Sequence, residues 1–575
     1  MLCIHRFVAG VFLALPLAAT TLSAQLTVPE RTRGERTSSH AEVLAFIDSL
    51  QHRGAKMLVG TLGESPQGRR LPYVILSRPQ VTTPAQAHRT GKPVFYIQAN
   101  IHAGEVEGKE AVQALMRDLT LGTLKPLLDS VIVLFVPIYN ADGNDAFGPQ
   151  DINRAEQLGP ERVGLRANGQ GYDLNRDYVK QEAPETRASL ALVAKWDPDL
   201  FMDLHTTDGS YHGYALTWSP GLNSNRTPTN SWVQDTVLEQ VRRRLREREH
   251  VATYLYGNFR GEAPQPTGWD TYEGLARYGT NLAGMTRLSI LSEAMSHDPF
   301  LRRIDATYAF VLETIRYLNE HRGAMHWHEA LTARFRPDSV VVRGNVLAAS
   351  PSRMDSVLVA VTDTVTMARS DSAVRARTPR TPQLGDTIGS CPASGAGRGE
   401  TGGRRAGRGG VTMTTRAVEA LTGRAHAVFM EVRDRFAPVR QEAIPAAYVF
   451  GSAWSKVVEL MRRQGIAVRR TTARWTGRTG HFAVDTLIHM AYFEGHCGLL
   501  VDGTWAVPAI DTVPAGSFVV PTNQRMGMVA AYLLEPSSED GYTHWNFFDR
   551  GLIQGGVSPV RRLLRMPALK TAAVP

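Results

Sequence analysis

The sequence predicts an α/β fold: a mixed, largely parallel sheet with helices on both faces, followed by a β-rich segment and a second α/β unit. Short apolar runs of five or six residues alternate with amphipathic stretches between about residues 39 and 322. Fully apolar strands between helices are typical of parallel sheets that are covered on both sides. The composition, 43% hydrophobic and 21% charged in 575 residues, is that of a globular chain long enough for several domains.

The expected strands and helices alternate along the first half of the chain. The strand-like runs are Leu71–Leu76, Val94–Ala99, Val131–Val136, Leu200–Leu204 and Arg287–Leu291. Helical spacing of apolar residues covers Ala41–Leu50, Val106–Leu119, Pro184–Trp196 and Phe300–Leu318. Because ligands of such sheets bind beyond the carboxyl ends of the strands, functional side chains are expected directly after these runs.

The second half of the chain divides by composition. Residues 335–374 alternate Val with polar residues and predict a β-rich connecting segment. Residues 375–412 are rich in Gly, Arg, Thr and Pro, which is typical of a flexible linker. Residues 413–575 are predicted to form a C-terminal α/β accessory domain, with a strand at Ala446–Phe450, a helix at Trp454–Arg463 and a further strand at Ile466–Arg469.

The N-terminus has the pattern of a secretory signal. His5 and Arg6 precede the apolar run Phe7–Leu22, and the small residues Ser23 and Ala24 follow it. This pattern predicts a signal peptide over residues 1–24 and an exported protein, either periplasmic or secreted. The alternative is an uncleaved membrane anchor, but the run is short for a bilayer span, and no later stretch approaches the roughly eighteen apolar residues of a transmembrane helix.

The formal charge of +9 does not indicate a nucleic-acid partner. Eight arginines between residues 375 and 416, against Asp386 and Glu400, account for +6 of this charge. Without that stretch and Arg6 the formal charge is +2, so the folded parts are nearly neutral and have no basic face suited to phosphates. Three cysteines are too few for a disulfide scaffold.

Three candidate metal ligands follow two of the expected strands. After the second strand, a tight turn contains His102 and Glu105, with Gly104 between them to let the backbone bend. Side chains at this spacing can bind one metal ion. The fourth strand delivers His205 at its carboxyl end. Three such ligands leave one coordination position open, which predicts a catalytic site with one Zn²⁺ per chain.

A carboxylate and a polar loop add the remaining chemistry. Glu293 follows the last expected strand and emerges at the same edge of the sheet, where it is the natural general base for a water molecule activated by zinc. Between these motifs lies a polar segment that contains Arg166, Asn175 and Arg176. Two arginines and an amide can hold a carboxylate and stabilise an oxyanion.

Taken in order, these motifs resemble those of one family, the zinc carboxypeptidases of the carboxypeptidase A type (peptidase family M14). The matching motifs are His102-x-x-Glu105, Tyr139-Asn140-Ala-Asp142-Gly143, Asp173-Leu-Asn175-Arg176-Asp177, His205 after a strand and Glu293 after the last strand. The resemblance implies a zinc carboxypeptidase catalytic domain over residues 39–325.

The resemblance also implies a role for each site residue. The three candidate ligands would bind zinc, and Glu293 would act first as general base and then as proton donor. Asn175 and Arg176 would hold the terminal carboxylate of the substrate. Asp173 would orient the ring of His102, a role that the chemistry of metal-bound histidine also predicts.

Two roles remain open between neighbouring residues. Arg166 most resembles the arginine that polarises the scissile carbonyl, with Arg162 as the alternative. The tyrosine that caps the bound substrate is either Tyr278 or Tyr272. The sequence does not predict which C-terminal residue is preferred.

The sequence therefore predicts an exported zinc metallocarboxypeptidase that removes the last residue of peptides with a free C-terminal carboxylate. One alternative is a zinc amidase or peptidase that acts on the stem peptides of peptidoglycan. A less favoured alternative is a non-catalytic peptide-binding protein, which the presence of all three ligands and Glu293 argues against. In the C-terminal half, Glu494 and His496 have no evident third ligand, so a structural role is expected for them.

Overall fold

The computed structural model describes most of the chain outside its N-terminus and one long internal stretch. The described residues are 26–207, 210–261, 266–346, 353–369 and 414–574. The predicted signal peptide and the predicted linker lie outside them. Among the described residues, no helix is long and apolar enough to cross a membrane. Cys497 is disulfide-bonded, and the other two cysteines, Cys3 and Cys391, are not among the described residues.

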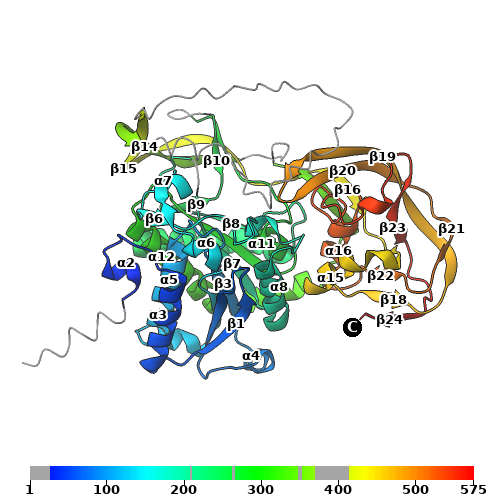
Figure 1. Ribbon diagram of the computed structural model, residues 1–575, viewed down its shortest axis with the longest axis horizontal. Coiled ribbons are helices and arrows are strands. Elements are labelled where there is room, and N and C mark those ends of the chain that lie inside the picture. Colours follow the sequence, from blue (N-terminus) through cyan, green and yellow to red (C-terminus); the bar gives the residue numbers. More distant parts are fainter. Residues whose placement is uncertain (1–25, 208–209, 262–265, 347–352, 370–413, 575) are drawn as a thin grey trace, which may run out of the picture.

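A mixed eight-stranded sheet forms the centre of the N-terminal part (Figure 1). In sheet order its strands are β1 (Leu58–Glu64), β2 (Arg70–Leu76), β4 (Ile132–Val136), β3 (Val94–Ala99), β7 (Leu200–Thr206), β12 (Leu288–Ala294), β8 (Leu216–Pro220) and β9 (Thr253–Leu255). The pairs β4–β3, β3–β7, β7–β12 and β8–β9 are parallel, and the other three pairs are antiparallel. This confirms the expected mixed, largely parallel sheet.

All five strands expected from apolar runs belong to this sheet. Every residue of β3, β4, β7 and β12 is buried, which is why these strands are rich in apolar residues. The strands that the sequence did not reveal lack such a run. β1 contains two glycines and is only partly buried, and β9 has three residues.

Helices cover both faces of the sheet (Figure 1). Phe95 and Ile97 of β3 point into a core shared with α3 (His40–His52), α5 (Glu107–Thr120) and α12 (Phe300–Glu320). The alternate residues, Val94 and Tyr96, point into a second core shared with α8 (Pro184–Trp196) and the region of α11 (Gly279–Gly284). Successive strand residues face opposite sides, so the two cores follow directly from the strand geometry.

Shorter elements connect the sheet to the rest of the chain. The remaining α-helices of the N-terminal part are α2 (Val28–Arg31), α4 (Pro84–Thr90), α6 (Ala141–Asp145), α7 (Gln150–Asn153), α9 (Pro228–Trp232), α10 (Leu238–Arg244) and α13 (Arg322–Arg334). The expected β-rich segment contains β13 (Ser339–Asn345) and β14 (Arg353–Arg369). β14 pairs with β15 (Thr414–Arg433), which also pairs in parallel with β11 (Gly268–Asp270), itself the partner of β10 (Asn258–Arg260). β13 pairs with β16 (Ala437–Ala443).

The C-terminal unit is β-rich, and every pair in its sheet is antiparallel. Its elements are β17 (Ala447–Phe450), α15 (Ser455–Arg463), β18 (Arg469–Thr471), β19 (Trp475–Phe493), β20 (His496–Trp505), β21 (Ala509–Val513), β22 (Phe518–Pro521), α16 (Gly527–Leu534), β23 (Val557–Leu563) and β24 (Thr571–Ala573). The strand expected from Ile466 begins only at Arg469, because the chain first turns at Gly465, which has a φ of 82°.

The C-terminal unit shares a core with one face of the first sheet. Trp196 of α8 belongs to the same buried cluster as Tyr448 of β17 and Leu460 of α15. Hydrogen bonds cross this boundary as well. The side-chain amide of Gln181 donates to the carbonyl oxygen of Leu460 at 2.9 Å, and that of Gln464 donates to the carbonyl oxygen of Tyr178 at 3.1 Å. The boundary is therefore a packed interior and not a loose contact between separate domains.

This shared core predicts a large effect of one tryptophan. Trp196, 1% exposed, lies inside the core, whereas Trp327 on α13 is 63% exposed. Trp196→Ala should lower the free energy of unfolding by about 3–5 kcal/mol, because it removes a large buried side chain and leaves a cavity. Trp327→Ala should change it by less than about 0.5 kcal/mol. Urea unfolding followed by circular dichroism measures both, and equal midpoints for the two variants would contradict the assignment of Trp196 to the shared core.

Candidate active site

The turn between β3 and α5 carries two of the candidate metal ligands. β3 ends at Ala99, α5 begins at Glu107, and His102 and Glu105 lie between them. The left-handed residue of this turn is Asn100, with a φ of 67°, and not Gly104, as the sequence suggested. Gly104 is needed for space instead, because a Cβ there would lie 2.6 Å from Cγ of Arg154.

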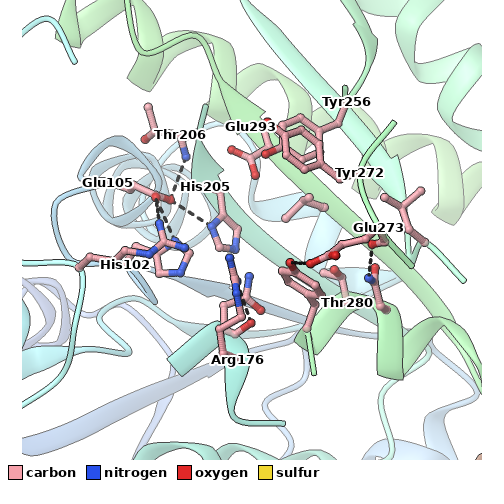
Figure 2. Close-up of a pocket in the computed structure, with 16 residues that line it drawn as sticks. His102, Glu105, Arg176, His205, Thr206, Tyr256, Tyr272, Glu273, Thr280 and Glu293 are labelled. Atoms are coloured by element: carbon pink, nitrogen blue, oxygen red, sulfur yellow. Dashed lines mark hydrogen bonds and ion pairs between the residues drawn. The ribbon is translucent and has the colours of Figure 1, made fainter. Parts of the chain in front are cut away.

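His102, Glu105 and His205 converge on one point (Figure 2). Nδ1 of His102 lies 2.9 Å from Oε1 of Glu105, and Nδ1 of His205 lies 3.0 Å from Oε2 of the same carboxylate. The two imidazole rings are 4.9 Å apart between centroids. All three side chains are buried, so the sequence motifs that were far apart in the chain meet in the interior.

The remaining ring nitrogens of the two histidines face other carboxylates. Nε2 of His102 is 3.0 Å from Oδ1 of Asp173, and Nε2 of His205 is 3.2 Å from Oδ2 of Asp203. The hydrogen bond between Nε2–H of His102 and Asp173 leaves the lone pair of His102 on Nδ1, facing the Glu105 carboxylate. His205 makes no hydrogen bond through Nε2, and in its Nε2–H tautomer the Nδ1 lone pair faces the same carboxylate. A cation satisfies such a set of acceptors, and imidazole with carboxylate is a donor set that suits zinc.

Glu105 collects most of the polar contacts of this region. In addition to facing Nδ1 of the two histidines, it accepts hydrogen bonds from Nη1 of Arg154 at 3.0 Å and from the backbone N–H of Thr206 at 3.1 Å. Burial by itself raises the pKa of Glu105, but the adjacent His102 and Arg154 hold it well below its usual range. The carboxylate is therefore ionised, as a metal ligand must be.

A cavity of about 270 Å³ opens beside these ligands. Its lining residues are His102, Glu105, Arg166, Asn175, Arg176, His205, Thr206, Leu222, Tyr256, Tyr272, Glu273, Tyr278, Thr280, Asn281, Leu291 and Glu293. Thus eight of the nine site residues named from the sequence line one cavity, and the ninth, Asp173, lies behind His102. Arg162 does not line the cavity; its guanidinium donates to the carbonyl oxygen of Phe147 at 2.8 Å.

Glu293 lies next to the metal-type cluster because of strand register. It is paired with His205 across the parallel strands β12 and β7. Both side chains are buried and both line the cavity. Figure 2 shows the Glu293 carboxylate on the far side of His205 from Glu105, near Tyr256. A carboxylate in this place can exchange a proton with a molecule that occupies the cavity.

The polar loop places its three named side chains around Asp173 and the cavity. Nε of Arg166 donates to Oδ2 of Asp173 at 2.8 Å, and its Nη1 lies 3.4 Å from Oε1 of Glu105. Burial raises the pKa of Asp173, but Arg166 and His102 outweigh it and hold this pKa well below its usual range. Asn175 accepts a hydrogen bond from the backbone N–H of Gly279 at 3.1 Å.

Both candidate capping tyrosines line the cavity, in different settings. The guanidinium of Arg176 lies 4.3 Å from the ring centroid of Tyr278, whose hydroxyl donates to Glu273 at 2.5 Å. Tyr272 stacks on Tyr256 with 4.5 Å between ring centroids and accepts a hydrogen bond from Asn258. Tyr278 is thus joined to the arginine that the sequence assigns to the substrate carboxylate, whereas Tyr272 belongs to an aromatic pair.

Sequence reasoning missed two residues that support the ligands. Arg154 lies directly after α7, outside any motif, and besides Glu105 it donates to the carbonyl oxygens of Thr206 and Thr207. No local signal identifies it. Asp203 precedes His205 by two residues on β7, so both side chains are on one face of the strand. That spacing is the signal that could have identified Asp203.

A second group of potential ligands lies at the opposite end of strand β7. Asp199, His326 and Glu329 also have ligand atoms within 4.8 Å of one another. Asp199 immediately precedes β7, whereas His205 lies near its carboxyl end. The two groups are therefore separated by the length of the strand, and metal analysis must distinguish them.

Comparisons with known proteins agree with the motifs. Residues 43–283 match the family described as zinc carboxypeptidase (Peptidase M14). The chain is 22% identical over 488 residues to "Carboxypeptidase 2" of Trichophyton equinum, covering 83% of this chain and 78% of that protein. It is 23% identical over 335 residues to "Carboxypeptidase M" of Mus musculus, covering 56% of this chain and 69% of that protein.

Solved structures in the comparison include carboxypeptidase A from Helicoverpa armigera, with a TM-score of 0.38 and 16% identity over 53% of this chain and 78% of that one. Residues 43–283, the part of the chain that carries the motifs described above, are similar to the M14 family of zinc carboxypeptidases.

Proposed function

We propose that the protein is an exported carboxypeptidase that hydrolyses the C-terminal peptide bond of peptides, with Glu293 as general base. One observation carries the proposal: the convergence of His102, Glu105 and His205 in the same cavity as Glu293 and Arg176. Export is proposed from the apolar run near the N-terminus, which lies outside the described residues.

The two histidines and Glu105 are the proposed zinc ligands. Their two Nδ1 atoms and the Glu105 carboxylate face one another, and Asp173 and Asp203 hold the rings from behind. A zinc ion bound there would act as a Lewis acid. It would polarise a carbonyl group and lower the pKa of a bound water molecule. The hydrogen bond to Asp173 fixes the orientation and the tautomer of the His102 ring, which raises the basicity of this ligand, and Asp203 lies 3.2 Å from Nε2 of His205.

Glu293 moves the proton in the proposed reaction. As the oxygen of a water molecule bonds to the scissile carbonyl carbon, a carboxylate oxygen of Glu293 takes one proton from that water. When the carbon–nitrogen bond breaks, Glu293 returns this proton to the leaving amine. The products are a shortened peptide and a free amino acid, and Glu293 is ionised again. The new carboxyl group of the peptide carries the second proton of the water and gives it up to the amine or to solvent.

The arginines orient the substrate and balance charge. Arg176, with Asn175 beside it, is proposed to bind the terminal carboxylate, because a guanidinium matches a carboxylate in shape and charge. Arg166 is proposed to stabilise the negative charge that develops on the carbonyl oxygen. Its side chain lines the cavity and lies 3.4 Å from Glu105, which supports this role over Arg162.

Removal of one ligand should remove the metal. The wild-type protein should contain about one zinc per chain at this site after dialysis, and His102→Ala should lose it because only two ligands remain. His326→Ala is the matched control, since His326 belongs to the second group of potential ligands. Elemental analysis measures both. If His102→Ala retained the zinc and His326→Ala lost it, the metal would be bound by the second group, Asp199, His326 and Glu329.

Removal of the proposed base should separate binding from chemistry. Glu293→Gln should keep the zinc but lower kcat by about 10²–10⁴-fold, because the amide cannot accept the proton of water. Glu247→Gln is the control, because it changes an exposed glutamate of the N-terminal part. It should keep the wild-type kcat. Hydrolysis of a short peptide, followed by release of the amino acid, gives both values, and wild-type turnover by Glu293→Gln would remove Glu293 from the mechanism.

The proposed carboxylate clamp predicts which end of a peptide is cut. Arg176→Ala should lower kcat/KM for a peptide with a free C-terminus by about 10–100-fold, because a charge-assisted hydrogen bond is lost. The slower hydrolysis of the same peptide with a C-terminal amide should not change, since that peptide has no carboxylate to bind. The exposed Arg246→Ala serves as control. Equal losses on both peptides would contradict a role for Arg176 in binding the carboxylate.

A further inference from the structure

The C-terminal unit contacts two segments that carry residues of the active site. One contact reaches the loop that carries Asp173, Asn175 and Arg176, and the other reaches the segment that carries Tyr278. The contacting residues, Glu494 and Asp540, are not among those that line the cavity. They lie where they can hold the walls of the cavity without touching what occupies it.

The first contact is made by the tip of the hairpin β19–β20. Phe493 pairs with His496, which leaves Glu494 and Gly495 as a two-residue turn with φ values of 49° and 86°. Such turns favour Asn or Gly at the first position, and a glutamate with positive φ costs backbone energy. A side chain kept at that cost is expected to make a specific interaction.

Glu494 makes that interaction with the backbone of Asp173. Its Oε2 accepts the N–H of Asp173 at 3.2 Å. Asp173 in turn holds Nε2 of His102 and Nε of Arg166. A chain of two contacts, from Glu494 to Asp173 and from Asp173 to His102, therefore leads from the C-terminal unit to a proposed zinc ligand. A shift of the Asp173 backbone would turn the His102 ring, because one carboxylate oxygen fixes it.

The hairpin tip is itself anchored to the catalytic part. Lys180 donates to the carbonyl oxygen of Glu494 at 2.7 Å and lies 4.9 Å from the ring centroid of Trp545. His496 lies with Nε2 3.0 Å from Oε1 of Glu182 and with Nδ1 3.1 Å from Oδ1 of Asn546. These contacts give His496 the structural role expected from the sequence, and they fix the position from which Glu494 reaches Asp173.

The second contact is a buried ion pair between Asp540 and Arg277. Oδ2 of Asp540 accepts the backbone N–H of Arg277 at 2.5 Å, and Oδ1 accepts its Nε at 2.9 Å. Nε1 of Trp545 donates to the same Oδ1 at 2.9 Å, and the Arg277 guanidinium lies 4.8 Å from the Trp545 ring centroid. A buried carboxylate with this many partners is a rigid point of attachment.

Arg277 immediately precedes Tyr278 in the chain. Tyr278 stacks on the guanidinium of Arg176, so the two segments that the C-terminal unit holds also contact each other. Asp540 thus sets where Tyr278 lies, and Glu494 sets where the loop of Arg176 lies. The distance between these two cavity residues depends on both contacts.

We infer that Glu494 and Asp540 are positioning residues of the active site, through which the C-terminal unit sets the geometry of the zinc ligands and of the substrate-carboxylate clamp. The inference rests on the proposed function in assigning roles to His102, Arg176 and Tyr278. Through these two residues the C-terminal unit would support the active site, which goes beyond the accessory domain expected from the sequence.

The first test compares variants of Glu494 in the full-length protein. Glu494→Ala should weaken zinc binding and lower kcat, each by about tenfold, at the lower end of the effects seen when the support of a metal ligand is removed. Glu494→Gln should restore both values, because its side-chain oxygen can still accept the N–H of Asp173. Glu459→Ala, an exposed carboxylate on α15, is the matched control and should change neither.

Zinc affinity is measured by competition with a coloured chelator, and the melting temperature is measured on the zinc-free protein. The expected result is weaker zinc binding by Glu494→Ala with an unchanged melting temperature. Wild-type zinc affinity and kcat in Glu494→Ala, or equal losses in Glu494→Gln, would overturn the inference. Because zinc affinity does not depend on the substrate, this result stands even if the wild-type protein fails to cut peptides, which would refute the proposed function alone.

The second test concerns Asp540 and separates the two contacts. Asp540→Asn keeps the size of the side chain but weakens its hold on Arg277, so KM for a peptide with a free C-terminus should rise by about tenfold while zinc affinity stays at the wild-type value. The assignment of Asp540 would be overturned if the dissociation constant for zinc rose as much in Asp540→Asn as in Glu494→Ala. An unchanged KM in Asp540→Asn would overturn it as well. If Asp540→Asn fails to fold, Trp545→Phe removes one hydrogen bond to the same carboxylate and should raise KM in the same direction.

Discussion

A single buried carboxylate, that of Glu105, is the constraint on which the rest of the site depends. A carboxylate that leaves water loses a large hydration energy, which only nearby cations and hydrogen-bond donors can offset. Glu105 has such donors in two separate parts of the chain, Arg154 after α7 and the N–H of Thr206 on β7, and its carboxylate also faces Nδ1 of His102 in its own turn and of His205 on β7. The sheet must close in this register for the carboxylate to be satisfied, so the order of the strands and the position of the ligands are linked.

The same logic extends outward from the ligands. Asp173 and Asp203 hold the outer nitrogens of the two histidines, and Asp173 is in turn held by Arg166 and by Glu494. Each residue in this series fixes the position of the next residue toward the metal ligands. A metal ligand needs this support because a ring that is free to turn presents its lone pair in the correct direction only part of the time. The outermost layer belongs to a unit more than three hundred residues further along the chain.

The sequence allowed the prediction of elements that are buried on both sides and of motifs at the ends of strands. β3, β4, β7 and β12 are mostly apolar because every residue in them is buried, so their positions follow from the apolar residues of the sequence. His102, Glu105, His205 and Glu293 could be named because they directly follow such runs. The proximity of Asp203 to His205 has a local signal in the period of the strand, which was not used.

Other features have no local signal. Arg154 occupies an irregular loop, and its position is set by what packs around it and not by periodicity. The long hairpin β19–β20 alternates exposed and partly buried residues, so its residues form no apolar run. The contact between Glu494 and Asp173 joins residues that no spacing rule relates, because it depends on how the two parts of the chain pack against each other.

The contacts of the C-terminal unit also determine how the cavity responds to substitutions. Tyr278 and Arg176 stack on each other in the lining of the cavity, yet one is held through Asp540 and the other through Glu494, two positions on different segments of the same C-terminal unit. Both contacts adjoin Trp545. Lys180, which donates to the carbonyl oxygen of Glu494, and Arg277, which pairs with Asp540, both lie over its ring. The side chain of Trp545 is nearly fully buried, so it cannot move without disturbing both contacts. Changes at this one tryptophan should therefore reach both walls of the cavity together, although it lies outside the cavity and outside the part of the chain that matches the family.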